Sequence, residues 1–499
     1  MNGRPSRLRA MFLPVRLDGD TKGSMVKRGS LSTLGVLFQS LVRFGTNAIV
    51  GRIGGPAVLG NFASAISTAQ LLTLLWPSAT GSAASKFIAR SRGKANPDET
   101  AAVAAHLARR TLQAALLLAV AAFPIWIVVG QGNVPAAAAV SLLVLSYSFY
   151  SFTRGVLFGA GQVARATGWD IATGVLGMVG VLVSLLVGVR GIFVLVPLSF
   201  AYLVFAMAGW PWGAKGRPDL VLRHELDGFV ALGVLGTVAS SGFLQLSTIF
   251  VRVAEGAAEA GQYAAALTLA TPPSVLAASL SMVLFPAMAE SWGRGDHTGF
   301  RRQTDQATRV LVVVMVAVFG VLALCSRQIV RLIWGESFSG AANLLLVLLV
   351  AVMMTTLSVA SVNSITTRSQ RGMVISASSS LIGMIMGVCV WLVLLPRIGA
   401  LGVAIGYLCG TVIIGGIPIA VAWRLDRQNW AGLAVKTAGG LVLMVSMLWL
   451  ERVAGPDYTL DPAFALAFLV AWLVVVHRDA RLVVGLVHSH ERVPAGGKE

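Results

Sequence analysis

The sequence predicts an all-α polytopic membrane protein with about fourteen transmembrane helices: two six-helix lobes, arranged as parallel repeats, and two extra C-terminal helices. Its composition is 56% hydrophobic and 12% charged, whereas a soluble domain is about 25% charged. Apolar runs of about 20 residues, the length that crosses a bilayer core, recur along the chain. The first lobe also repeats in the second at a spacing of about 200 residues. These observations indicate a chain surrounded mostly by lipid.

The apolar runs define the elements of each part. The parts, in order, are a basic N-terminal tail 1–28, a first lobe 29–212, a linker 213–227, a second lobe 228–422, an extra helix pair 423–477 and a tail 478–499. The spans expected in the first lobe are 29–51, 57–80, 110–130, 134–157, 166–188 and 191–212. Those expected in the second lobe are 228–251, 260–286, 308–325, 340–364, 371–395 and 399–422. The extra pair comprises 432–451 and 462–477.

The repeat is clearest at the first two helices of each lobe. Leu34-Gly35-Val36-Leu37 recurs as Leu232-Gly233-Val234-Leu235, and Gly60-Asn61-Phe62-Ala63 recurs as Gly261-Gln262-Tyr263-Ala264. Because each copy holds an even number of helices, both copies enter the membrane from the same side. Two similar bundles with a cleft between them are typical of alternating-access transporters.

Lysine and arginine predict the orientation. The tail, linker and loops on the N-terminal side carry more than four times as many of these residues as the opposite loops. Loops rich in lysine and arginine stay in the cytoplasm. We therefore expect both termini, the linker 213–227 and the tails 1–28 and 478–499 to be cytoplasmic. Met25 would also make a natural translation start, a hypothesis that N-terminal mass spectrometry tests.

Several function classes are disfavoured by what the sequence lacks. The loops are too short for a catalytic domain, there is no Walker A sequence, and no acidic residue or histidine is placed like a catalytic pair. We therefore expect no enzyme activity, no cofactor and no metal. The basic residues lie between apolar runs, so nucleic acid is not an expected partner. Cys325, Cys389 and Cys409 have no ligand spacing and are interpreted as small hydrophobic residues.

One cation lies deep in the first predicted span. Gln39, Arg43 and Asn47 are spaced by four residues, so they share one helix face. A polar stripe of this kind cannot face lipid. We predict that it faces the cavity between the lobes and binds substrate. Packing of Arg43 against neighbouring carbonyl groups is the alternative.

The first helix of the second lobe has a matching stripe. Ser241, Gln245 and Arg252 lie on one face, and the repeat aligns them with Arg43, Asn47 and Arg52. We predict that all of them line the substrate cavity. Arg52 and Arg252 lie at the outer ends of their helices, so extension of these side chains to the membrane surface explains them equally well.

Further candidates lie on other helices. We predict substrate contacts for Asn61 on the second helix, Arg154 on the fourth beside Tyr147 and Tyr150, and Asn363 on the tenth. Polar side chains in membrane helices often form hydrogen bonds only with backbone or with neighbouring helices. For each of these residues, such a structural role is the alternative to substrate binding.

A proline pair in the eighth predicted helix must interrupt its hydrogen-bond ladder. Pro272 and Pro273 are adjacent, so we predict a kink there that serves as a hinge.

Acidic residues are expected only near the membrane edges. None of the 21 falls in the middle of a predicted span, and Asp170 and Glu290 come nearest. A cation-coupled drug antiporter needs a buried carboxylate. The sequence instead predicts a cavity with a cation and no anion, which favours a negatively charged passenger.

The span count, the repeat and the two Gly-x-Phe/Tyr-Ala steps resemble the polysaccharide flippases of the multidrug/oligosaccharidyl-lipid/polysaccharide (MOP) superfamily. The resemblance implies that the passenger is an undecaprenyl-pyrophosphate-linked glycan, such as an exopolysaccharide or O-antigen repeat unit. It implies movement from the inner to the outer leaflet of the bacterial plasma membrane. The implied partners are this glycan, the lipid bilayer and a polysaccharide polymerase or assembly complex.

Three alternatives stay open from the sequence. A peptidoglycan-precursor (lipid II) flippase would use the same mechanism on another sugar. A MATE-like drug or cation antiporter would share the fold, against which the missing carboxylate argues. A membrane scaffold for glycan assembly would tolerate Arg43→Ala, whereas a flippase would not.

Overall fold

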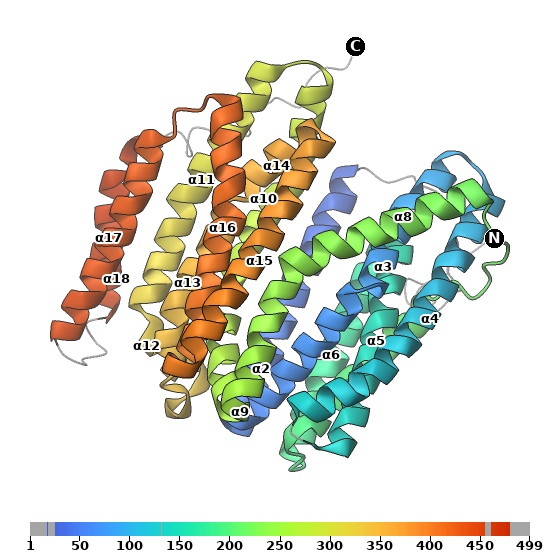
Figure 1. The fold of residues 1–499 in the computed structure, drawn as a ribbon, viewed down its shortest axis with the longest axis horizontal. Coiled ribbons are helices and arrows are strands. Elements are labelled where there is room, and N and C mark those ends of the chain that lie inside the picture. Colours follow the sequence, from blue (N-terminus) through green and yellow to red (C-terminus); the bar gives the residue numbers. More distant parts are fainter. Residues whose placement is uncertain (1–16, 18–24, 131, 455–460, 480–499) are drawn as a thin grey trace, which may run out of the picture. The chain divides into compact units, whose positions relative to one another are not determined.

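The computed structural model describes residues 17, 25–130, 132–454 and 461–479 (Figure 1). The predicted tails, 1–28 and 478–499, lie almost wholly outside these ranges. Every regular element within them is helical, so the predicted all-α class is confirmed. The chain divides into two compact units, Met1–Ala265 with Ile398–Val403, and Ala266–Arg397 with Ala404–Glu499.

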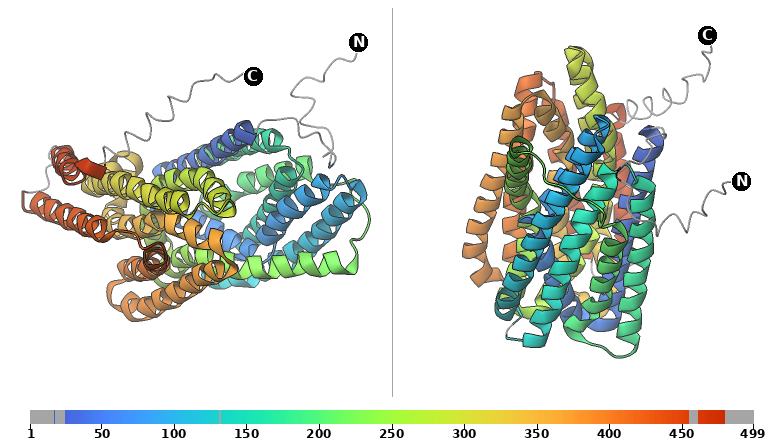
Figure 2. Two further views of the ribbon diagram at one scale, coloured as in Figure 1. Left: turned by 90° about the horizontal axis from the view of Figure 1, so that it is seen from above. Right: turned by 90° about the vertical axis from the view of Figure 1, so that its right-hand side faces the viewer.

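The first unit extends past the predicted first lobe, because the opening helices of the second repeat pack within it. Its elements are α2 (Met25–Leu74), α3 (Pro77–Gly93), α4 (Pro97–Val129), α5 (Val134–Gly159), α6 (Val163–Leu186), the 3₁₀ helix η1 (Gly191–Leu195), α7 (Val196–Gly209), α8 (Leu220–Thr237), the π-helix η2 (Val238–Gly242) and most of α9 (Phe243–Ala270). Helices α3, α4 and α5 pack against one another, and α8 packs on α3 (Figures 1 and 2).

The second unit holds the remaining helices, apart from residues 398–403, where α15 ends and α16 begins. They are α10 (Pro272–Gly293), α11 (His297–Leu324), α12 (Ser326–Trp334), η3 (Glu336–Phe338), α13 (Ala341–Leu357), α14 (Val359–Arg368), α15 (Gln370–Ile398), α16 (Ala400–Asp426), α17 (Ala431–Ala454) and α18 (Asp461–Val475). The C-terminal pair α17 and α18 packs on α11.

Twelve helices in the described ranges are long and apolar enough to cross a membrane. Two of them, Leu34–Leu74 and Leu220–Ala270, have 41 and 51 residues, well beyond the length of one crossing. Asp461–Val475 is apolar but shorter. The protein is therefore multi-pass, while the count of fourteen stays a prediction.

A glycine kink divides each of two long helices at equivalent places in the repeat. Gly55 in α2 has φ 79° and ψ −179°, and Gly256 in α9 has φ 89° and ψ −173°. This backbone region is open essentially only to glycine. The predicted break after the first span of each lobe is thus a sharp bend within a continuous helical run.

The turn before α4 recurs before α11 with the same backbone bonds. In the first copy the amides of Lys94, Ala95 and Asn96 donate to the carbonyls of residues 90, 92 and 91. In the second copy residues 294, 295 and 296 donate to 290, 292 and 291. Asn96 and Asp296 then cap the following helices. The sequence repeat is therefore a repeat of local structure.

Small and aromatic side chains form the core of the first unit. Phe87 from α3, Leu107 from α4, Phe152 from α5 and Leu226 from α8 are all fully buried in one cluster. Alanines of α3 and α4 fill the space between them and allow the helices to approach closely. This packing holds α4 and α5 in place behind the candidate site.

Candidate functional site

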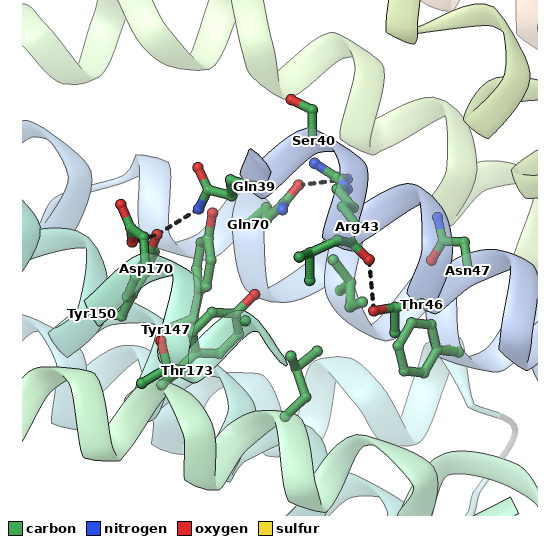
Figure 3. Close-up of a pocket in the computed structure, with 16 residues that line it drawn as sticks. Gln39, Ser40, Arg43, Thr46, Asn47, Gln70, Tyr147, Tyr150, Asp170 and Thr173 are labelled. Carbon is green, nitrogen blue, oxygen red and sulfur yellow. Dashed lines mark hydrogen bonds between the residues drawn. The ribbon is translucent and has the colours of Figure 1, made fainter. Parts of the chain in front are cut away.

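A cavity of about 190 Å³ opens within the first unit, beside the first half of α2. The predicted stripe Gln39, Arg43 and Asn47 lines it (Figure 3). The other lining residues come from α2, α5, α6 and α7: Ser40, Val42, Thr46, Phe62, Ile66, Gln70, Tyr147, Tyr150, Asp170, Thr173, Gly174, Leu198 and Tyr202. The spacing of four residues along α2 thus brings these three polar side chains to one cavity.

Arg43 is exposed and bonds a neutral partner. Its Nη2 donates to Gln70 Oε1 at 3.3 Å, across the two halves of α2 (Figure 3). The ion pairs found among the described residues do not include Arg43. Because an amide oxygen orients a guanidinium without neutralising it, the positive charge stays available to an anion.

A second group of polar side chains forms a chain on the cavity wall. Gln39 Nε2 donates to the Tyr150 hydroxyl at 2.5 Å, and this hydroxyl donates to Asp170 Oδ1 at 2.8 Å. Arg154 Nε donates to Asp170 Oδ2 at 2.9 Å. Asp170 is buried, with a side-chain exposure of 3%. This chain connects α2, α5 and α6.

The prediction of a cavity without an acidic residue is wrong, because Asp170 lines it. Asp170 lies near the start of α6 and Arg154 near the end of α5, two helices joined by a short turn. Their ends therefore meet at one depth, beside Gln39 on α2. Since Arg154 neutralises Asp170, Arg43 remains as the unbalanced charge among the described lining residues.

Tyrosines form the aromatic part of the wall. The ring centroids of Tyr147 and Tyr202 lie 5.2 Å apart, and those of Tyr150 and Tyr202 lie 4.9 Å apart. Tyr150 also packs edge-on against Phe205 at 4.7 Å. Rings held in this way present hydroxyl groups and flat apolar faces at fixed positions.

The remaining predicted site residues of the first unit lie away from this cavity. Arg252 is buried on α9, and its Nε donates to Asn61 Oδ1 at 3.1 Å. Gln245 is buried on the same helix, whereas Ser241 is exposed in the π-helix η2. Arg52 is exposed beside the Gly55 kink. A substrate role for these residues stays a prediction.

In the second unit, Asn363 Nδ2 donates to Ser281 Oγ at 2.7 Å and links α14 to α10. The proline pair stands at a helix start rather than inside a helix, because α9 ends at Ala270 and α10 begins at Pro272. Proline is well tolerated in a first turn. The hinge role of Pro272 and Pro273 stays a prediction.

Sequence reasoning missed Gln70, Asp170 and Tyr202 as cavity residues. Gln70 follows Phe62 and Ile66 at intervals of four, so helical periodicity could have found it. Asp170 and Tyr202 reach the cavity only through the packing of α6 and α7, which no local pattern reveals.

Comparisons with known proteins agree with this fold. The family model described as polysaccharide biosynthesis protein matches residues 25–292, more than half of the chain. No curated protein matches the sequence. Among solved structures, the lipid II flippase MurJ in an inward closed conformation has a TM-score of 0.68 at 12% identity, over 90% of this chain and 99% of that one.

Two further solved structures are similar. An inward-facing multidrug resistance MATE family transporter of the MOP superfamily has a TM-score of 0.63 at 17% identity, over 78% of this chain and 94% of its own. A MOP superfamily transporter from Pyrococcus furiosus has a TM-score of 0.54 at 16% identity, over 82% and 97%. These findings confirm the resemblance to the MOP superfamily that the sequence suggested.

Proposed function

The chain belongs to the polysaccharide biosynthesis protein family, and from this premise we propose that it is a flippase for a polyprenyl-pyrophosphate-linked oligosaccharide. It moves this substrate from the inner to the outer leaflet of the bacterial plasma membrane by alternating access, with both termini in the cytoplasm. A polysaccharide polymerase or assembly complex then receives the glycan. The observation that carries the proposal is Arg43, a cation without an acidic partner among the described residues, on the wall of a polar cavity.

The two polar parts of such a substrate, the pyrophosphate and the sugars, each have matching groups in the cavity. The pyrophosphate carries negative charge and pairs with the guanidinium of Arg43 through charge-assisted hydrogen bonds. Sugar hydroxyls exchange hydrogen bonds with amides and hydroxyls such as Gln39, Asn47 and Tyr147, which line the same cavity. The polyprenyl tail needs no polar site and stays in the bilayer.

Transport then follows from binding in one conformation and release in the other. Occupation of the cavity favours closure on the entry side, because the bound headgroup contributes contacts that the open state lacks. The glycine kinks at Gly55 and Gly256 provide the bends that helix rearrangement needs. The wall formed by Arg154 and Asp170 is neutral overall, so it does not repel the anion.

Complementation of a bacterial strain that lacks its polysaccharide flippase tests the proposal. We expect wild type and Arg43→Lys to restore surface polymer, and Arg43→Ala to lose transport by roughly ten- to hundredfold, the value of a charged hydrogen bond. Arg371→Ala, which removes an exposed charge on α15, is the matched control and is expected to act as wild type. Full activity of a normally expressed Arg43→Ala protein would contradict the proposal.

A drug or cation antiporter is the second candidate, because Asp170 places a carboxylate on the cavity wall. Its bond to Arg154 argues against cation binding there, since a cation would have to displace an internal partner. Drug resistance conferred by wild type and lost in Asp170→Asn, without any polymer restored, would favour the antiporter. Polymer restored in a lipid II flippase mutant would instead identify a peptidoglycan precursor as the cargo.

A further inference from the structure

A basic pocket lies in the first unit between α4 and the start of α8, and it shares no lining residue with the Arg43 cavity. Gln113 and five basic side chains line this pocket: His106, Arg109, Arg110, Arg217 and Arg223. The linker before α8 supplies Arg217, and α8 itself supplies Arg223. Four arginines around one pocket create a strongly positive surface.

Only part of this positive charge is neutralised nearby. Asp227 on α8 contacts both His106 Nε2 and Arg110 Nη2 at 3.2 Å. Arg109 donates to the carbonyl of Gly216 at 2.9 Å, a neutral group. The Nε of Arg223 is buried and has no hydrogen-bond partner in the part of the chain that the structure describes. The pocket therefore holds more cationic donors than the described residues satisfy.

An apolar groove continues directly from the basic pocket. Its lining includes Leu75, Trp76, Leu117 and Leu118, and it shares Arg110 and Gln113 with the pocket. The α4 residues of both regions follow one another at intervals of three and four, so they form one stripe on that helix. The stripe is basic at one end and apolar at the other.

The length of α4, taken with the predicted span 110–130, puts this change from basic to apolar near one membrane surface. The helix has 33 residues, about 50 Å at 1.5 Å per residue, whereas a bilayer core is about 30 Å thick. The predicted span 110–130 puts Arg109 and Arg110 at the boundary and Leu117 and Leu118 within the hydrocarbon. A positive end at headgroup depth and an apolar end below it match an anionic lipid.

We propose that the basic pocket and the apolar groove together bind one anionic membrane phospholipid. The headgroup phosphate accepts hydrogen bonds from Arg109, Arg217 and Arg223, and an acyl chain lies along Trp76 and Leu118. Basic pockets at the cytoplasmic ends of membrane helices bind anionic headgroups in this way. The alternative is that these arginines serve only to orient the chain in the membrane. That role explains the basic residues. It does not explain the continuous apolar groove, or the buried Nε of Arg223 that lacks a hydrogen-bond partner among the described residues. The site does not depend on the nature of the transported substrate.

Native mass spectrometry of the purified full chain with phosphatidylglycerol or phosphatidylcholine of equal acyl chains tests the site. We expect wild type to retain phosphatidylglycerol selectively. The basic variant replaces three arginines: Arg109→Gln, Arg217→Gln and Arg223→Gln. Since each basic residue near an anionic surface contributes about one tenfold step or slightly less, we expect its affinity for phosphatidylglycerol to fall by roughly 100-fold.

The control variant also removes three positive charges, but from exposed arginines at the start of α11 and just before it. These arginines line neither the pocket nor the groove, and the changes are Arg294→Gln, Arg301→Gln and Arg302→Gln. We expect it to retain the lipid as wild type does. Ala114→Phe keeps every charge but fills the groove, so it is also expected to weaken phosphatidylglycerol binding. The proposal is overturned if wild type shows no preference between the lipids, or if both triple variants lose the lipid equally. It is also overturned if Ala114→Phe has no effect while inorganic phosphate displaces the ligand.

Discussion

Gly60 and Gly261 pack reciprocally where the second half of α2 crosses the second half of α9. A Cβ on Gly60 would collide with the carbonyl oxygen of Ala257, and one on Gly261 would collide with that of Pro56. The two glycines begin the Gly-x-Phe/Tyr-Ala steps of the repeat, and Phe62 and Tyr263 beside them are fully buried. The repeated motif is thus a contact between the two repeats themselves.

Alanine at either glycine should therefore separate this crossing. We expect Gly60→Ala and Gly261→Ala each to reduce the free energy of unfolding by about 1–3 kcal/mol, because the added methyl group meets backbone that cannot rotate away. Thermal unfolding in detergent measures the change. Gly236→Ala in α8 is the control, since a Cβ there meets open space and alanine favours a helix. Equal melting temperatures of Gly60→Ala and wild type would contradict the reciprocal contact.

Loss of one partner of the Arg154–Asp170 pair should destabilise the protein. We expect Arg154→Ala to cost about 3 kcal/mol of unfolding free energy, because it leaves a buried carboxylate uncompensated. The double variant Arg154→Leu, Asp170→Leu should recover most of this loss. The exposed pair Arg294–Glu290 supplies the control, and Glu290→Ala should cost at most about 0.5 kcal/mol. A double variant as unstable as the single one would show that the pair acts through other contacts.

Asn61 should stabilise the protein through Arg252. Its side chain accepts the Nε–H of a buried guanidinium, so Asn61→Ala leaves that donor unsatisfied and should cost about 1–3 kcal/mol. Asn61→Asp restores an acceptor and adds a charge, so it should be at least as stable as wild type. Chemical denaturation of the purified protein compares the two. If Asn61→Asp is as unstable as Asn61→Ala, the hydrogen bond is not the source of the effect.

The carboxylate of Asp479 joins the C-terminal helices to α11. Lys436 Nζ and Arg309 Nη1 donate to it at 2.5 Å and 2.6 Å. Burial tends to raise the pKa of Asp479, but these hydrogen bonds outweigh it and hold the pKa below its ordinary value. The pKa of Asp479 is lower in the folded protein than in the unfolded chain. The ionised carboxylate and its two cationic partners therefore stabilise the protein fully at pH values above the ordinary aspartate pKa of about 3.9. Its contribution is lost as the pH falls through the folded pKa.

Asp479→Asn should accordingly lower the unfolding free energy by about 1–2 kcal/mol at neutral pH, since both cations are partly exposed. The difference from wild type should stay constant from pH 7 to about pH 5 and shrink below about pH 4. Denaturation series across this range provide the measurement. If the difference in unfolding free energy between Asp479→Asn and wild type grew as the pH fell, this prediction would be contradicted.

Local periodicity predicted much of this structure. The helical class, the repeat and the shared face of Gln39, Arg43 and Asn47 follow from hydropathy and from spacing along one helix. At Gly55 and Gly256 the sequence predicts only loops between spans, because hydropathy does not show whether a helix resumes at once after a break. Hydropathy places Asp170 near a membrane edge, so the sequence predicts a cavity without this carboxylate, whereas Asp170 lines it. Its true position depends on the packing of α5 and α6 against α2, which involves residues more than a hundred positions apart.

The internal pairing of Arg154 with Asp170 has a consequence for how the cavity selects its cargo. Because that pair cancels within the wall, the sign of the cavity rests on the side chain at position 43. A single replacement there, such as Arg43→Glu, would invert the charge that faces the cavity and would involve neither the Arg154–Asp170 pair nor the Gly60–Gly261 crossing. The charge that this cavity selects is therefore set at one position, and changing it requires one substitution rather than a rebuilt binding site.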